Sequence, residues 1–256
     1  MANESKLHLV MLPWLAFGHF IPFLELSKFI AQRGHRVPFI STPRNIAPLP
    51  KIPPHLVSSI TFVKIPLPQV EGLPKNAEAT MDIHTDQMSL LKKAYDGLEP
   101  ELTRFLENSL PDWIVHDFAS HWVLPVSAKL GILKSFFCIV SAWCLGFLGP
   151  SDMLINGTDP RSKAEDFMVP PKWVAFQTKV VYKIHETDSV LRIANPNVSG
   201  ASDAYRVGMV TRDSDVVIAR HSYEFEGDCL KLLNEIHPTP VMPLGLVPPH
   251  SKLTTK

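Results

Sequence analysis

The stretch "LHLVMLPWLAFGHFIPFLELSKFIAQRGH" (residues 7–35) decides the fold, because it reads as a buried strand, a short loop and a helix. Leu7–Trp14 is a continuous apolar run, which favours a strand buried on both faces. The apolar side chains of Phe20–Arg33 recur with the period of a helix. Pro22 near the start of this helix and Gly34 just after its end fit the residues preferred at those positions.

The alternation of short apolar runs and helical patterns continues along the chain. Further strands are expected at residues 37–41, 59–65, 113–116, 135–141, 215–219 and 240–245. Residues 150–205 read as irregular, proline-rich and weakly helical, and helices are expected at 120–131, at 225–236 and at 85–108, the last with a break or kink at Pro100. Apolar strands that alternate with helices predict an α/β fold, a Rossmann-like parallel sheet with helices on both faces.

The composition excludes several classes of partner. The 256 residues contain 25 lysines and arginines and 25 aspartates and glutamates, so we expect neither nucleic acid nor an anionic membrane as a partner. The longest apolar run, residues 135–149, is shorter than the ~20 residues of a membrane helix, so no membrane insertion is expected. The start, "MANESK", lacks a signal-peptide pattern, and two of the three cysteines lie in an apolar run that suits reduced thiols. A cytoplasmic protein is therefore expected.

The expected topology brings two distant polar residues together. In a sheet of this type the first and fourth strands lie side by side, and ligands bind in the crevice beyond their carboxyl ends. His19 follows the first strand, and Asp117 closes the fourth in "DWIVHD". Ser141, at the end of the fifth strand, is expected next to them.

His19 has the setting of a catalytic base. A histidine ahead of a helix feels the positive end of the helix dipole, which disfavours the imidazolium and leaves a ring that accepts a proton. An adjacent carboxylate holds the ring in one tautomer and stabilises the imidazolium once it forms. With Asp117 beside it and no serine nucleophile nearby, His19 is typical of a group that deprotonates a substrate hydroxyl. The alternative is a histidine satisfied by local hydrogen bonds.

Other motifs are missing or ambiguous. The chain has no G-x-G-x-x-G after the first strand, no G-x-x-x-x-G-K-[ST] and no G-x-S-x-G, which argues against dinucleotide, P-loop and hydrolase chemistry. No cysteine or H-E-x-x-H pattern accompanies His116 and His121, so no metal site is expected. His121 fits pocket lining or helix packing. Several aromatic side chains near strand ends could line an apolar acceptor site or belong to the core, namely Trp14, Phe118, Trp122 and Trp143.

Four stretches closely resemble the N-terminal half of plant UDP-dependent glycosyltransferases of the GT-B fold: "LPWLAFGHFIPFLELSKFIAQRGHRVPFISTPRN", "LLKKAYDGLEPELTRFL", "DWIVHDFASHW" and "PVMPLGLVPP". The resemblance covers essentially the whole chain in order. It is closest to the branch that adds rhamnose or glucose to a sugar already carried by a flavonoid, terpenoid or saponin. It implies an inverting, metal-free hexosyl transfer from a UDP-sugar to a hydroxyl of such a glycoside, with no other cofactor.

The resemblance also assigns roles to residues. It implies that His19, in the "G-H" motif, removes the proton from the acceptor hydroxyl. Asp117, in "HDFASHW", matches the partner aspartate, and Ser141, in "CIVSAW", matches a residue that contacts the donor. The acceptor contacts of relatives fall near the positions of Trp14, Phe118, His121, Trp122 and Trp143.

One departure from the family pattern is large. The second, UDP-binding domain of the family carries a signature box, and neither W-x-P-Q nor H-C-G-W-N-S occurs here. We therefore expect residues 1–245 to form the acceptor-binding N-terminal domain, residues 246–256 to begin the linker, and the C-terminal domain to be absent. Such a half-enzyme, a truncated product or a fragment of a longer chain, is expected to bind UDP-sugar poorly and to turn over little without its missing domain.

Two other functions are weighed. A catalytically silent module derived from this family would hold a glycoside or a protein in the same cleft. Replacing His19 with alanine in a chain completed with its second domain distinguishes that module from the enzyme. A nucleotide-using oxidoreductase with the same broad fold is disfavoured by the missing glycine fingerprint.

Overall fold

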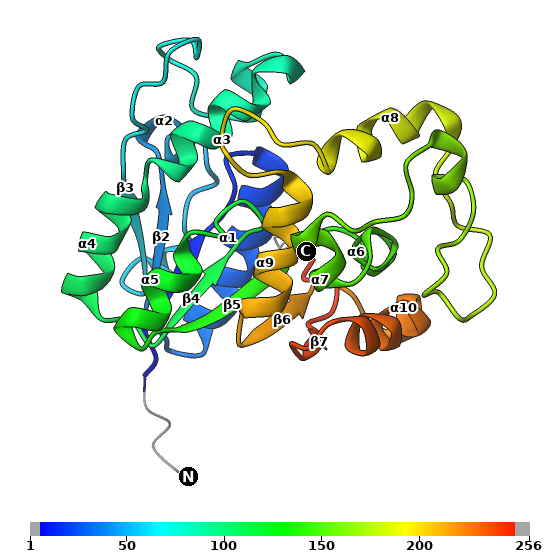
Figure 1. Cartoon of the computed structure of the whole chain (residues 1–256). Coiled ribbons are helices and arrows are strands. Elements are labelled where there is room, and N and C mark those ends of the chain that lie inside the picture. Colours follow the sequence, from blue (N-terminus) through cyan, green and yellow to red (C-terminus); the bar gives the residue numbers. More distant parts are fainter. Residues whose placement is uncertain (1–5, 249–256) are drawn as a thin grey trace, which may run out of the picture.

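The computed structural model describes residues 6–248, and its centre is a seven-stranded sheet (Figure 1). The strand order is β3-β2-β1-β4-β5-β6-β7, and every neighbouring pair is parallel. The strands are β1 (Leu9–Leu12), β2 (Val37–Ser41), β3 (Ile60–Lys64), β4 (Trp113–His116), β5 (Leu133–Cys138), β6 (Val216–Ala219) and β7 (Val241–Pro243). The predicted fold class is confirmed, and β1 and β4 are neighbours as expected.

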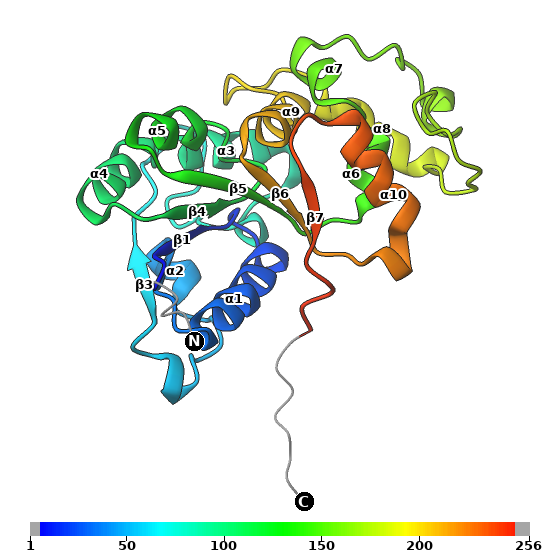
Figure 2. The same cartoon turned by 90° about the horizontal axis from the view of Figure 1, so that it is seen from below.

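Helices cover both faces of the sheet. Their bounds are α1 (Phe17–Gln32), α2 (Pro43–Ile46), α3 (Met88–Asp96), α4 (Glu99–Ser109), α5 (Val123–Leu130), α6 (Ala142–Leu148), α7 (Ser151–Asn156), α8 (Ile184–Ile193), α9 (Asp203–Asp213) and α10 (Tyr223–Ile236). Figure 2 shows α1 on one side of the strands and α3, α4, α5 and α9 on the other. Short 3₁₀ turns lie at Pro54–Leu56, Thr80–Asp82, Thr85–Gln87 and Ala164–Phe167.

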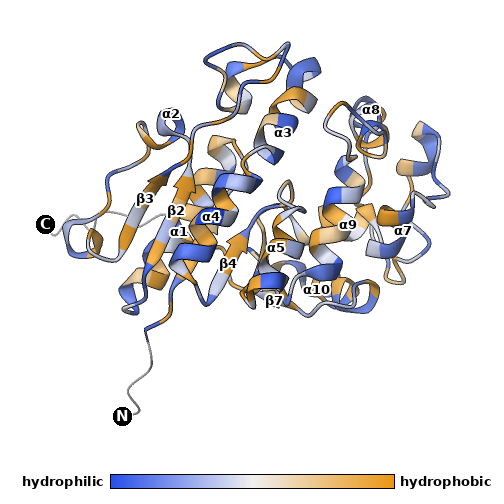
Figure 3. Ribbon diagram, turned by 60° about the vertical axis from the view of Figure 1, so that its left-hand side comes forward, coloured by the Kyte–Doolittle hydropathy of each residue, from blue (hydrophilic) through white to orange (hydrophobic). Residues whose placement is uncertain are grey.

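The strands form because their side chains are apolar toward both helical layers. All five residues of β2 are buried, and so are the last three of β1. In Figure 3 the strands are largely orange, whereas α4 and α9 carry both colours, as expected for helices with one buried stripe. Two apolar cores result, one around β1–β4 with α1, α3 and α4, and one around β5–β7 with α6, α9 and α10.

His19 lies inside α1 and not ahead of it, which corrects the predicted helix start. The apolar period placed the start at Phe20, but α1 begins at Phe17 after the extended Ala16. Gly18 is exposed and His19 is only partly buried, so the first turn adds little to the buried stripe from which the period was read. His19 is therefore in the first turn of α1, the part of a helix on which its dipole mainly acts.

The predicted long helix over residues 85–108 is two helices, and Pro100 is not the break. Residues Thr85–Gln87 form a 3₁₀ turn, α3 ends at Asp96, and α4 begins at Glu99. Pro100 sits in the first turn of α4, where a backbone N–H has no partner within the helix and its loss costs little. The chain turns before the proline.

Residues 150–205 are more ordered than the sequence indicated, which corrects a second expectation. They contain α7, α8 and the start of α9. The Arg161 guanidinium lies 5.2 Å from the ring centroid of Phe147, 4.6 Å from that of Phe167 and 4.7 Å from that of Trp173. These cation–π contacts fix the long connection against α6 from outside the sheet, and such contacts between distant residues leave no periodic signal in the sequence.

The remaining boundaries differ by a few residues. Each expected strand is present, β2 and β4 with the predicted bounds and the others shorter. β5 ends at Cys138, so Ser141 lies beyond the strand and not in it. The 120–131 helix begins at Val123, because the residues before it form the turn that follows β4. Within residues 6–248, no helix is both long and apolar enough to span a bilayer.

Candidate active site

The carboxyl ends of β1 and β4 place His19 and Asp117 together. The parallel register pairs Leu12 with His116, so the residues that follow each strand leave the sheet side by side. The backbone N–H of Trp14 donates to Asp117 Oδ2 over 3.0 Å, and the N–H of Phe118 donates to Asp117 Oδ1 over 2.8 Å. Two backbone donors therefore orient the Asp117 carboxylate at the sheet edge.

His19 Nδ1 lies 2.7 Å from Asp117 Oδ2. The His19 side chain is 19% exposed, while that of Asp117 is 2% exposed. A carboxylate can only accept, so His19 donates from Nδ1, and its Nε2 carries the free lone pair. Nε2 is neither buried nor hydrogen-bonded within residues 6–248, so it is available to an incoming hydroxyl proton.

The turn after β4 is tightly bonded. The Ser120 hydroxyl donates to the Asp117 carbonyl over 2.8 Å. His116 points into the core on the far side of the strand, 3.1 Å from the hydroxyl of Ser214. Burial lowers the pKa of His116 from 6.5 to about 4, so this ring is neutral. His116 therefore supports the turn and takes no part in the open edge.

The predicted aromatic positions fall in two settings. The indoles of Trp14 and Trp122 are buried in the core, each with an edge-on contact to the ring of Tyr95, whose hydroxyl donates to the Pro13 carbonyl. Phe118 is half-buried, and its ring centroid lies 5.9 Å from that of His19. Of these three aromatic residues, Phe118 contacts the His19 ring, while Trp14 and Trp122 back the site from the core.

Ser141 lies beyond β5, the strand next to β4, as the N-cap of α6. Its hydroxyl oxygen accepts the N–H of Cys144 over 3.0 Å. The Glu226 carboxylate, brought from α10, accepts the N–H groups of Ala142 over 3.0 Å and of Trp143 over 3.3 Å. Ser141 and Trp143 line a hollow of about 360 Å³ together with residues of the 176–180 segment and of α10.

Sequence reasoning missed a charged residue at the same edge. The guanidinium of Arg206, on α9, contacts Asp96, the Ala119 carbonyl and His121. The only signal for this cluster is the four-residue spacing of Lys92 and Asp96, which reads as a solvated helix face. Within residues 6–248 no group of three or more His, Cys, Asp or Glu side chains could hold a metal ion.

Comparison with known proteins adds relatives to this geometry. No protein-family model matches the chain. The chain is 46% identical to UDP-glycosyltransferase 91C1 of Arabidopsis thaliana over 247 residues, which are 96% of this chain and 53% of that protein. It is 36% identical to soyasaponin III rhamnosyltransferase of Glycine max over 257 residues, 98% of this chain and 52% of that protein. The chain spans about half the length of the curated relatives it matches.

Solved structures share the fold. UGT73P12 of Glycyrrhiza uralensis, complexed with glycyrrhetinic acid 3-O-monoglucuronide, gives a TM-score of 0.69 at 22% identity. The match covers 95% of this chain and 49% of the UGT73P12 chain. UGT89C1 of Arabidopsis thaliana, complexed with UDP-L-rhamnose, gives a TM-score of 0.64 at 18% identity. The match covers 96% of this chain and 53% of UGT89C1. These identities speak for the fold alone. Together with the curated relatives, they confirm the resemblance to plant UDP-dependent glycosyltransferases over essentially the whole chain.

Proposed function

We propose that this chain is the acceptor-binding part of a UDP-sugar-dependent glycosyltransferase, and that it transfers a hexosyl group to a hydroxyl of a plant glycoside when a UDP-binding domain completes it. Residues 1–245 form the acceptor domain in this proposal. Residues 246–256 begin the linker, and positions 249–256 lie outside the described residues. The similarity to UDP-glycosyltransferases over about half their length supports this division.

The 2.7 Å contact between His19 Nδ1 and Asp117 Oδ2 carries the proposal. His19 Nε2 removes the proton of the acceptor hydroxyl as the oxygen attacks the anomeric carbon of the donor. The bond from that carbon to UDP breaks on the opposite face, so the configuration inverts, and UDP leaves with the electron pair. General-base catalysis of this kind contributes about 10²–10⁴-fold to a rate.

Asp117 has two functions in this step. It keeps the proton of the neutral ring on Nδ1, so that Nε2 is the basic nitrogen. It also stabilises the imidazolium formed after the transfer, because the buried carboxylate carries the opposite charge. The step needs no metal, and the UDP-sugar is its second substrate.

The names of relatives support a glycosidic acceptor. Soyasaponin III rhamnosyltransferase and anthocyanidin-3-O-glucoside rhamnosyltransferase of Petunia hybrida, the latter 29% identical, are named for rhamnosyl transfer. In this proposal the donor carries rhamnose or glucose, Ser141 contacts it, and the acceptor is a flavonoid, terpenoid or saponin glycoside. Phe118, His121 and Trp143 contact the acceptor, with Trp14 and Trp122 behind them.

The test is product formation by a fusion of this chain to the remaining half of the Arabidopsis relative. The fusion is incubated with UDP-glucose or UDP-rhamnose and a panel of glycosides, and products are detected by mass spectrometry. We expect transfer by the fusion, little by the chain alone, no loss in EDTA, and near-complete loss in His19→Ala. The exposed His55→Ala is the control. A fusion that binds glycosides without any transfer, before or after the substitution, would instead indicate a silent binding module.

A further inference from the structure

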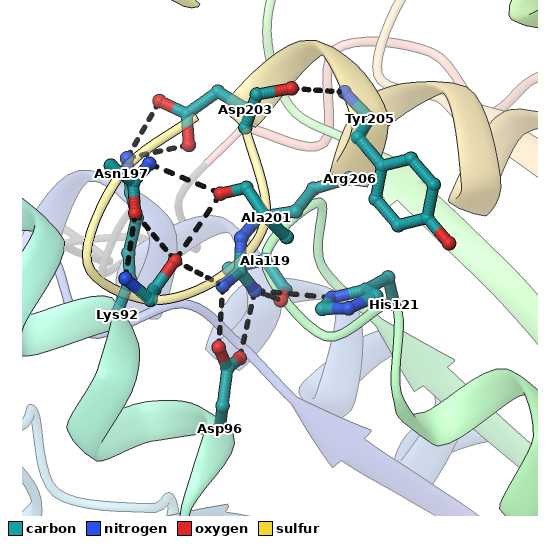
Figure 4. Close-up of polar contacts among 11 residues, drawn as sticks. Lys92, Asp96, Ala119, His121, Asn197, Ala201, Asp203, Tyr205 and Arg206 are labelled. Atoms are coloured by element: carbon teal, nitrogen blue, oxygen red, sulfur yellow. Dashed lines mark hydrogen bonds and ion pairs between the residues drawn. The ribbon is translucent and has the colours of Figure 1, made fainter. Parts of the chain in front are cut away.

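Arg206 is a fully buried arginine whose guanidinium joins four segments of the chain. It reaches from α9 to the carboxylate of Asp96 on α3, with one bond of 2.8 Å to Oδ1. The same group donates to the Ala119 carbonyl over 2.5 Å and to the Ser199 hydroxyl over 2.9 Å. Figure 4 shows these contacts converging on the guanidinium beside the turn that follows β4.

The fourth contact of Arg206 is with the ring of His121. One terminal guanidinium nitrogen lies 3.1 Å from His121 Nδ1. The same nitrogen also contacts Asp96 and the Ala119 carbonyl, so its two hydrogens are shared among three acceptors. Arginine has donors only and keeps its proton at all ordinary pH values, so the contact is favourable when Nδ1 carries a lone pair and unfavourable when it carries a proton. The proton of the neutral ring is then on Nε2.

A second ion pair anchors the arginine helix. Lys92 Nζ lies 2.6 Å from the carboxylate of Asp203, one turn from the Asp96–Arg206 pair on both helices. The two pairs have opposite polarity, so α3 and the first turn of α9 are held in one register. Arg206 therefore has little freedom to leave His121.

The surroundings of His121 favour the neutral ring. Burial and then the charge of Arg206 lower the pKa of His121. The charge of Asp96 and an interaction with the Ala119 backbone raise it but only partly offset the lowering. The ring of Tyr205 packs edge-on against it at 5.7 Å. Nε2 of His121 is neither buried nor bonded within residues 6–248, so its N–H is free to meet a ligand.

We propose that Arg206 is a positioning residue that fixes His121 as a neutral imidazole with its proton on Nε2, so that His121 donates a hydrogen bond to an uncharged oxygen of the bound acceptor. A sugar hydroxyl or a glycosidic oxygen has this chemistry. Because Asp96 neutralises Arg206, the corner offers a donor without a net charge and gives a carboxylate or phosphate no special attraction. The ligand part of this inference rests on the proposed function, whereas the tautomer does not.

The tautomer is tested on the chain itself by NMR with ¹⁵N-labelled histidine. The chain has 11 histidines, so the His121 signals are identified by their loss in His121→Gln. We expect the Nε2–H pattern at about pH 8, and protonation of the ring only below the ordinary pH range of a histidine, because its pKa is lowered. In Arg206→Lys, whose single ammonium cannot contact Asp96, Ala119 and His121 at once, the tautomers should mix and the ring should titrate at higher pH.

Two further variants guard against unfolding as an explanation. Asp203→Asn breaks the neighbouring ion pair without touching His121, so its His121 signals should stay unchanged. The neutral pair Asp96→Asn with Arg206→Met should reproduce the effect of Arg206→Lys without leaving a buried unpaired charge. An Nδ1–H pattern in the native chain, or a pattern that Arg206→Lys leaves unchanged in a folded protein, overturns the assignment.

The ligand part is tested in the fusion described above. The amide nitrogen of His121→Gln can replace Nε2–H, whereas that of His121→Asn stands nearer the position of Nδ1. We expect His121→Gln to keep the KM for the acceptor within about 3-fold and His121→Asn to raise it about 10-fold or more with a smaller change in kcat. Equal KM values for both variants would refute the donor role. If the fusion has no transfer activity at all, the proposed function fails while the NMR result still decides the tautomer.

Discussion

His19 and His121 stand near the two ends of one turn, the Asp117–His121 segment, and their Nδ1 atoms meet opposite charges. Nδ1 of His19 lies 2.7 Å from a carboxylate, while Nδ1 of His121 lies 3.1 Å from a guanidinium. The first partner accepts and the second donates. One ring is therefore left with a lone pair on Nε2, and the other, in our inference, with a proton there.

The comparison shows that the side chain that contacts Nδ1 determines whether a histidine at this edge accepts or donates a proton through Nε2. The open nitrogen is Nε2 in both rings, and whether it carries a proton depends on the group that contacts Nδ1. Asp117 comes from the strand end next to His19, whereas Arg206 comes from a helix far along the chain. A proton acceptor and a proton donor can thus face one molecule.

Removing His19, the ring whose Nε2 carries the lone pair, should have the largest effect on kcat. In the fusion, His19→Ala should lower kcat by about 10³–10⁴-fold with acceptor binding largely kept, because the base is lost while the aromatic walls remain. Steady-state kinetics and acceptor titration separate the two quantities. Activity within about 10-fold of the native fusion would show that His19 is a structural histidine and remove one side of the comparison.

Changing the partner of His19 should have the next largest effect. Asp117→Asn offers His19 an amide donor or a neutral oxygen, and the tautomer that His19 needs is no longer enforced. We expect kcat to fall about 10²–10³-fold. Stability should also fall by about 1–3 kcal/mol, since the amide cannot accept from both Trp14 and Phe118. Urea unfolding of the chain measures the stability, and an unchanged kcat would contradict the role of Asp117.

His237 differs from both His19 and His121 because neither of its ring nitrogens has a partner within residues 6–248, and this should make stability depend on pH. Burial alone lowers the pKa of His237 from 6.5 to about 4, and neither ring nitrogen has a partner within residues 6–248. Between these pH values the unfolded chain binds the proton and the folded chain does not, so stability is complete above about pH 6.5 and falls as pH decreases toward 4.

His237→Leu should remove part of that acid loss. We expect the difference in unfolding free energy between about pH 7 and pH 4.5 to shrink by roughly 2–3 kcal/mol, while His116, with its pKa also lowered to about 4, retains its own share. Urea unfolding at the two pH values gives the comparison, with exposed His55→Leu as the control. An identical pH dependence in His237→Leu would contradict the assignment.

Ser141 should give the smallest effect. Ser141→Ala removes the N-cap bond to Cys144 and should cost about 1 kcal/mol of stability, whereas Ser141→Asn retains a cap. Neither change touches His19 or His121, so the pH profile of kcat in the fusion should stay in place. A shifted profile would show that Ser141 acts on one of the two rings and is not only a cap and donor contact.

Much of the fold could be predicted because buried parallel strands are recorded in contiguous apolar residues. Val37–Ser41 and Trp113–His116 were located to the residue. The start of α1 was not located, because part of its first turn is exposed. The break before α4 was not located either, because the buried Leu98 continues the apolar pattern across it. The α7–α9 region was underestimated because its order depends on Arg161 and other contacts between distant side chains.

The candidate site divides in the same way. Topology alone brought His19 to Asp117, since both follow strands whose neighbourhood is fixed by the strand order. The role of Arg206 could not be predicted, because a single arginine in a helix with both polar and apolar residues gives no indication that it is buried. The setting of Trp14 and Trp122 also depended on Tyr95, which sits on a helix whose packing partner the sequence does not specify.

The reach of Glu226 from α10 to the start of α6 has a consequence for any phosphorylated molecule at this edge. Exposed amide groups at a helix start usually attract anions. Here the amides of Ala142 and Trp143 already hold a carboxylate, so the protein supplies its own internal counter-anion. A diphosphate that contacts Ser141 would therefore not be held by these two amides, while the Ser141 hydroxyl keeps its proton to donate. In the proposed enzyme the charge of the donor diphosphate would therefore be balanced by groups other than the start of α6.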